Sequence, residues 1–244
     1  MKNGFIKSLA LTVIIICGVW YIFEHTTLKL DNVNYKESKA DLTKKEKLVN
    51  EQDKFVDGNN IDVGEELILV NSENGLNKNY KPKDLTVPNI VFVNGVNHEE
   101  KQLAGIIVKP LEELIKSARR EGIVLLGNSG YRSYKSQENT YKNRVKSEGK
   151  ALADAYVAKP GFSEHQTGLC IDIANESRLF IKGTKEADWL AKNCYKFGFI
   201  IRYPYGKKSI TGIEYEPWHI RYVGKKTAKY IYDNGITLEE YLEK

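Results

Sequence analysis

Short blocks of apolar and polar residues follow one another from about residue 66 to the C-terminus, and they predict a mixed α+β domain. Residues 111–121 are predicted to form a helix, because four apolar side chains would share one face: Leu111, Leu114, Ile115 and Ala118. Pro110 suits the first turn of this helix and Gly122 its C-terminal end. A second amphipathic pattern predicts a helix at 185–196, and further helices are expected around Gln137 and at the C-terminus.

Apolar runs between these helices predict strands or extended segments. They lie at 67–71, 90–93, 123–126, 169–173, 199–203 and 216–223. Helices come before strands and the chain returns antiparallel, so the pattern favours an α+β fold with a small antiparallel sheet flanked by helices over a doubly wound sheet.

The N-terminus has a different pattern. Lys2 and Lys7 precede a charge-free run at 8–23, which is slightly short of the roughly 20 residues that cross a bilayer upright. No small-residue cleavage site follows, so residues 1–23 are predicted to be an uncleaved signal anchor or transmembrane segment. Residues 24–65 are polar and predict a flexible stem, and residues 66–244 are predicted to form the folded domain. We expect a single-pass membrane protein whose folded domain is exported.

Charge and cysteine content narrow the class of protein. The formal net charge is +5, with charges of both signs interspersed, which disfavours a nucleic-acid partner. Of the three cysteines, Cys17 lies in the apolar N-terminal segment, and Cys170 and Cys194 are interpreted as two buried thiols rather than a disulfide. On a strand, Cys170 would share a face with Asp172, which makes it an alternative metal ligand.

Two stretches carry the candidate chemistry, residues 161–173 and 216–220, and they contain two of the four histidines. His165, Asp172 and His219 supply two imidazoles and a carboxylate, the ligand set of a catalytic zinc site with its fourth position left to water. We therefore expect one Zn²⁺ per chain. Glu216 is the candidate general base for hydrolysis of an amide by metal-activated water, with Glu214 as the alternative. Pro217 predicts a bend that brings Glu216 and His219 to the same side.

Three other residues are candidates for substrate contacts. Arg132 follows a predicted buried strand, and its guanidinium suits either a C-terminal carboxylate or an oxyanion formed during attack. Gln137 and Ser163 can hydrogen-bond a peptide. Trp218 and Tyr203 are expected to form walls of the pocket or to pack in the core.

Three motifs in this order resemble the VanY-type D-alanyl-D-alanine carboxypeptidases: Ser129-Gly130-Tyr131-Arg132-Ser133, Ser163-Glu164-His165-Gln166-Thr167-Gly168 through Asp172, and Glu216 through Gly224. The resemblance covers roughly residues 67–235. It implies the fold of the lysostaphin, DD-carboxypeptidase and sonic-hedgehog-like group. It also implies zinc on His165, Asp172 and His219, Glu216 as catalytic base, and Arg132, Gln137 and Ser163 as substrate contacts. The implied substrates are peptidoglycan stem peptides, cut before the terminal D-alanine. Residues 66–244 are therefore expected to be a zinc carboxypeptidase domain that is extracellular and faces the cell wall.

Other functions are compatible with parts of the sequence. An LD-carboxypeptidase acting on tetrapeptide stems, or an endopeptidase, would use the same metal residues with a differently shaped pocket. A non-catalytic wall-binding module would be favoured by a missing ligand or base, and all are present. A serine-type penicillin-binding enzyme is suggested by Ser147 and Lys150, but no Lys-Thr-Gly follows and Gly149 weakens the helix that this pairing needs.

Overall fold

The computed structural model describes residues 64–243. The predicted anchor at 1–23 and nearly all of the predicted stem at 24–65 lie outside the described residues. Within the described range, no helix is both long enough and apolar enough to span a membrane.

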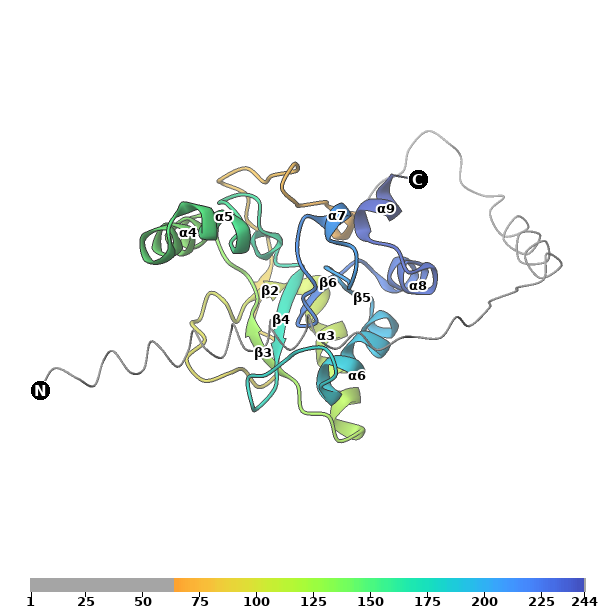
Figure 1. Cartoon of the computed structure of the whole chain (residues 1–244). Coiled ribbons are helices and arrows are strands. Elements are labelled where there is room, and N and C mark those ends of the chain that lie inside the picture. Colours follow the sequence, from red (N-terminus) through yellow and green to blue (C-terminus); the bar gives the residue numbers. More distant parts are fainter. Residues whose placement is uncertain (1–63, 244) are drawn as a thin grey trace, which may run out of the picture. The chain divides into compact units, whose positions relative to one another are not determined.

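A four-stranded antiparallel sheet lies at the centre of the domain, as predicted (Figure 1). Its order is β3 (Leu126–Ser129), β4 (Cys170–Ala174), β6 (His219–Tyr222) and β5 (Phe199–Ile201). A smaller antiparallel pair consists of β1 (Leu85–Thr86) and β2 (Leu103–Ala104).

Helices surround this sheet (Figure 1). The α-helices of the described part are α3 (Gly105–Arg120), α4 (Tyr134–Glu148), α5 (Lys150–Tyr156), α6 (Lys185–Asn193), α7 (Lys208–Thr211), α8 (Lys225–Asn234) and α9 (Leu238–Leu242). The described part also contains three short 3₁₀ helices: η1 (Glu65–Leu67), η2 (Glu164–Thr167) and η3 (Cys194–Phe197). The α+β class is therefore confirmed for the described domain.

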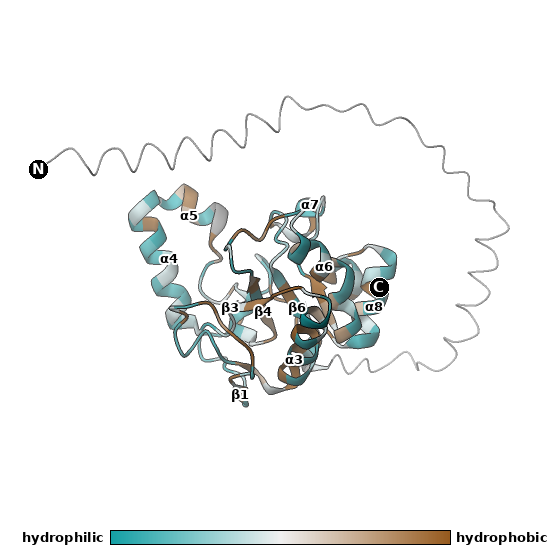
Figure 2. Cartoon of the chain, turned by 90° about the horizontal axis from the view of Figure 1, so that it is seen from below, coloured by the Kyte–Doolittle hydropathy of each residue, from teal (hydrophilic) through white to brown (hydrophobic). Residues whose placement is uncertain are grey.

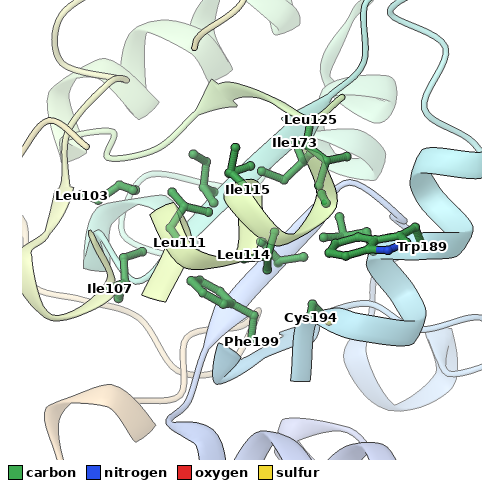
Figure 3. Close-up of a cluster of buried hydrophobic side chains, with 14 of the residues drawn as sticks. Leu103, Ile107, Leu111, Leu114, Ile115, Leu125, Ile173, Trp189, Cys194 and Phe199 are labelled. Atoms are coloured by element: carbon green, nitrogen blue, oxygen red, sulfur yellow. The ribbon is translucent and has the colours of Figure 1, made fainter. Parts of the chain in front are cut away.

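The main core lies between α3 and one face of the sheet (Figure 3). The predicted face of α3 is buried there, and the sheet contributes Ile171, Ile173 and Ile220, all almost fully buried. Side chains alternate across a strand, so the other face of β4 and β6 is left for different residues. This alternation places the candidate site on the side of the sheet away from α3.

The predicted start of α3 was wrong. The helix begins at Gly105, and Pro110 lies inside it rather than in its first turn. Proline lacks the N–H that would bond to the carbonyl of Ile106, so the longer helix loses one backbone hydrogen bond. Burial of Ile107, together with the pairing of β2 directly before the helix, compensates for this loss.

Several predicted strands are shorter or later than expected. The segment at 123–126 forms strand only from Leu126, and the segment at 216–223 only from His219. Pro217 lies in a turn closed by a hydrogen bond from the His219 N–H to the Glu216 carbonyl (3.3 Å), which confirms the predicted bend. Residues 68–70 form no strand, and Phe92 contributes one isolated bridge to Gly127.

The pair α4–α5 projects from the domain as a polar arm (Figure 2). Helix α4 is capped by the Ser133 side chain, which accepts a hydrogen bond from the Ser136 N–H, and Gln137 is its buried residue. Ion pairs on its surface, such as that of Lys142 with Glu138, stabilise a helix with little apolar surface. The first turn of the arm thereby presents Gln137 toward the site.

Candidate metal centre and catalytic cavity

The register of the sheet brings the two candidate stretches together. Asp172 of β4 is paired with His219 of β6, and Cys170 is paired with Arg221. Residues directly opposite in an antiparallel pair share a face, so these four side chains lie on the face turned away from α3.

His165 reaches this face from η2, the turn before β4. Gly168 links the two elements with a φ of +66°, and a Cβ there would lie 2.9 Å from the backbone nitrogen of Ala104, so the link requires glycine. The His165 Nδ1 lies 2.7 Å from the Gly130 carbonyl, the partner expected to hold the proton on Nδ1. Gly130 is tightly packed, and no larger residue fits there because a Cβ would lie 2.6 Å from the Gln102 carbonyl oxygen.

The nitrogen and oxygen atoms facing one another fit a metal ion. His219 Nδ1 lies 3.0 Å from Asp172 Oδ1, and His165 Nε2 lies 3.6 Å from Asp172 Oδ2. Ligands at about 2.0–2.2 Å from a tetrahedral zinc are about 3.4 Å apart, close to both distances. The remaining nitrogens face the protein, with His165 Nδ1 at the Gly130 carbonyl and His219 Nε2 at 3.3 Å from Glu164 Oε2. This donor set fits zinc.

Cys170 lies beside the same imidazoles. Its sulfur and one ring nitrogen from each of His165 and His219 lie within 4.8 Å of one another, so the thiol stays an alternative ligand by distance. Cys170 is fully buried and is absent from the lining of the adjacent cavity. Burial alone would raise the pKa of its thiol, but the two histidines lower it to about 7. Cys170 and Cys194 are both free and buried, as predicted.

A cavity of about 590 Å³ is lined by the three candidate metal ligands. Its lining includes all seven candidate site residues: Arg132, Gln137, Ser163, His165, Asp172, Glu216 and His219. Tyr203 and Trp218 are also lining residues, as one of the two sequence interpretations expected. The volume is within the usual range for small-ligand sites.

Glu216 is placed beside the candidate metal ligands by the bend at Pro217. Its Oε2 lies 3.9 Å from His219 Nδ1, and its N–H donates to the Tyr203 carbonyl at 3.1 Å. Burial raises the pKa of the Glu216 carboxyl, an effect that His219 partly offsets. Glu214 instead points to solvent and pairs with Lys208, outside the cavity lining. The geometry therefore favours Glu216 over Glu214 as the base.

Arg132 is held firmly by protein partners. Its Nε and Nη2 donate to Glu100 Oε1 at 3.3 and 3.2 Å, Nη2 also donates to Ser129, and Nη1 donates to Gln137 Oε1 at 3.0 Å. A guanidinium has five N–H donors, so one N–H of Nη1 is left for a substrate. Gln137 is held in turn by its Nε2, which donates to the Ala158 carbonyl at 2.7 Å. Arg132 and Gln137 thus act as one fixed unit.

Sequence reasoning missed a buried charged cluster behind His219. Its four members are Glu164, Arg202, Arg221 and Glu239, and both guanidiniums are fully buried. Burial alone would raise the pKa of Glu164, but Arg202, Arg221 and His219 hold it well below its usual value. One available signal was the single charge of Arg202 within the apolar run 199–203. Glu100, which anchors Arg132, gave no such signal.

Comparison with known families agrees with this geometry. Residues 100–225 match the family described as VanY: D-alanyl-D-alanine carboxypeptidase. The matched range contains every candidate site residue and more than half of the chain. The chain belongs to the VanY family of D-alanyl-D-alanine carboxypeptidases.

Individual relatives support the same assignment. The Bacillus subtilis (strain 168) protein YodJ, a proposed carboxypeptidase by name, is 45% identical over 183 residues, or 73% of this chain and 67% of YodJ. The solved structure of the LdcB LD-carboxypeptidase superposes with a TM-score of 0.70 at 43% identity, covering 78% of this chain and 92% of that one. A VanY D,D-pentapeptidase from a VanB-type resistance cassette, solved with Zn(II), superposes with a TM-score of 0.62 at 37% identity, covering 73% and 99%.

Proposed function

We propose that this protein is a zinc-dependent D-alanyl-D-alanine carboxypeptidase that removes the C-terminal D-alanine from peptidoglycan stem peptides. His165, Asp172 and His219 would hold the single zinc ion. The observation that carries the proposal is the position of the Asp172 carboxylate, 3.0 Å from His219 Nδ1 and 3.6 Å from His165 Nε2, beside the cavity that Glu216 also lines. The family match and the Zn(II) complex of a VanY relative support it.

When bound, zinc supplies Lewis acidity and makes water a nucleophile near neutral pH. Glu216 accepts the proton of the attacking water and passes it to the leaving amine, so that one water is consumed and free D-alanine is released. The free N–H of Arg132 Nη1 donates to the substrate's carboxylate or to the oxygen that gains charge. Gln137 and Glu100 fix the direction of that donor.

The pH dependence follows from the role of Glu216 as a base. Its carboxylate must be ionised to accept a proton, and burial raises its pKa above the ordinary glutamate value of 4.5. We therefore expect kcat/KM to fall as the pH drops through this raised pKa, above the range where an exposed glutamate would titrate. A pH–rate profile of D-alanine release measures this limb, and an acid limb at or below 4.5 would contradict it.

An LD-carboxypeptidase that removes D-alanine from tetrapeptide stems is the second candidate, favoured by the similarity to LdcB. Incubating the purified full-length chain with defined penta- and tetrapeptide stems, followed by mass spectrometry, separates the two. Our proposal predicts loss of one D-alanine from the pentapeptide, abolished by a metal chelator and insensitive to a β-lactam. Cleavage of the tetrapeptide alone would support the LD-specific reading. Tight binding without cleavage would support a wall-binding module.

We further propose that residues 1–23 anchor the enzyme in the cell membrane, with the catalytic domain outside and facing the wall. The support is the charge-free run at 8–23 after Lys2 and Lys7. Cell fractionation with protease treatment of intact spheroplasts tests it. We expect the chain to be recovered with the membranes and its domain to be digested by protease added outside. A domain fully protected from the protease would contradict the orientation.

A further inference from the structure

We propose that Glu164 is a positioning residue that holds the His219 ring with Nε2–H toward the protein and Nδ1 toward the metal. The two buried arginines, Arg202 and Arg221, would hold Glu164 in place for this task. The inference rests on the proposed function to the extent that it takes His219 as a metal ligand.

The two oxygens of Glu164 have separate partners. Oε1 accepts from Arg202 Nε at 2.7 Å and from Arg221 Nη1 at 2.7 Å. Oε2 lies 3.3 Å from His219 Nε2. A carboxylate only accepts hydrogen bonds while ionised, so the proton of this contact belongs to the imidazole. The proton on Nε2 leaves the lone pair of Nδ1 directed at the Asp172 side of the site, 3.0 Å from Oδ1.

The cluster is balanced in charge without help from His219. Arg202 also donates to both oxygens of Glu239, from Nη1 at 2.9 Å and from Nη2 at 2.6 Å. Two guanidiniums therefore face two carboxylates, so the charges of these four side chains balance without a charge on the His219 ring. The neutral imidazole is the form that binds a metal.

The arginines are fixed from outside the site. Arg221 Nη2 donates to the Glu66 and Ile68 carbonyls at 3.0 and 2.7 Å, and Glu239 belongs to α9 near the C-terminus. The side chains of Arg202, Arg221 and Glu164 are 0% exposed. Such a cluster costs desolvation that apolar residues of similar volume would avoid, so stability alone does not account for it. The shared contact with His219 gives it a role in orienting the ligand.

The test compares Glu164→Gln with Glu239→Gln as a matched control. Both substitutions remove one buried carboxylate paired with Arg202, but only Glu164 contacts His219. Zinc affinity is measured by competition with a chelator, and the ligand field by the visible spectrum of the Co(II)-substituted protein. We expect Glu164→Gln to lower zinc affinity by about 10- to 100-fold and to alter the Co(II) spectrum. Glu239→Gln is expected to change both readouts far less, because Glu239 reaches His219 only through Arg202 and Glu164.

Equal zinc affinities and spectra in the two variants would overturn the proposal. Because neither readout uses activity, wild-type protein that fails to release D-alanine would refute the proposed function while leaving this comparison intact. If Glu164→Gln does not fold, nitrogen-15 NMR of the zinc-loaded wild type decides the question. A proton on His219 Nε2 that is slow to exchange is expected, and a proton on His219 Nδ1 would overturn the proposal.

Discussion

Replacing Glu216 with glutamine is expected to lower kcat for D-alanine release by about 10²- to 10⁴-fold, the range that a positioned acid–base group contributes. Glutamine has nearly the same size but cannot take up a proton. The side chain lies beside the metal-binding atoms at 3.9 Å from His219 Nδ1, outside the proposed ligand set, so bound zinc should stay at one per chain. Steady-state kinetics together with metal analysis of the same preparation measure both effects.

Glu214→Gln is the matched control for this experiment. Glu214 lies two residues earlier on the same segment, is exposed, and pairs with Lys208 in solvent. Its replacement should leave kcat near the wild-type value, since exposed ion pairs contribute little. If Glu214→Gln loses activity and Glu216→Gln retains it, Glu214 is the base and the role proposed for Glu216 is wrong.

Replacing Arg202 with leucine is expected to lower the free energy of unfolding by about 3–5 kcal/mol, the cost of removing one partner from a buried ion pair. Arg202 is fully buried and contacts both Glu164 and Glu239. Its loss leaves Glu239 without its bidentate partner and Glu164 with Arg221 as its remaining guanidinium partner. Urea unfolding of the metal-free protein measures the change without a contribution from zinc binding.

Lys207→Leu provides the control for burial. Lys207 also pairs with a glutamate of α9, Glu240, at 3.0 Å, but both side chains are more than a quarter exposed. Its replacement should cost about 0–1 kcal/mol. If Arg202→Leu and Lys207→Leu lower the free energy of unfolding by similar amounts, the buried cluster does not stabilise the fold as proposed.

The grouping of the candidate metal ligands could be predicted because the residues lie in two short stretches of the sequence. His165 and Asp172 lie within one stretch, and Glu216 and His219 within another, so residue type and spacing indicated a shared site. The strand register then brought these stretches together as expected, with Asp172 opposite His219. Pro217 likewise predicted the bend that places Glu216 beside His219.

The supporting residues were not predictable, because they depend on tertiary contacts. Glu164 meets Arg202 and Arg221 only after β4, β5 and β6 have assembled, and no spacing in the chain encodes those pairs. The same reason explains the start of α3, where burial of Ile107 outweighs the local preference of Pro110 for a first turn. Local patterns therefore indicated the candidate site residues, whereas tertiary packing determined which side chains contact them.

X-ray absorption spectroscopy of the zinc-loaded protein is the decisive test of the proposed zinc ligands, because it reports the atoms bound to the metal. Ligation by His165, His219, Asp172 and solvent predicts nitrogen and oxygen neighbours alone, at about 2.0–2.2 Å, with the outer-shell signal of two imidazoles. A sulfur neighbour at about 2.3 Å would instead place Cys170 in the ligand set, and a signal from fewer than two imidazoles would contradict the proposed site.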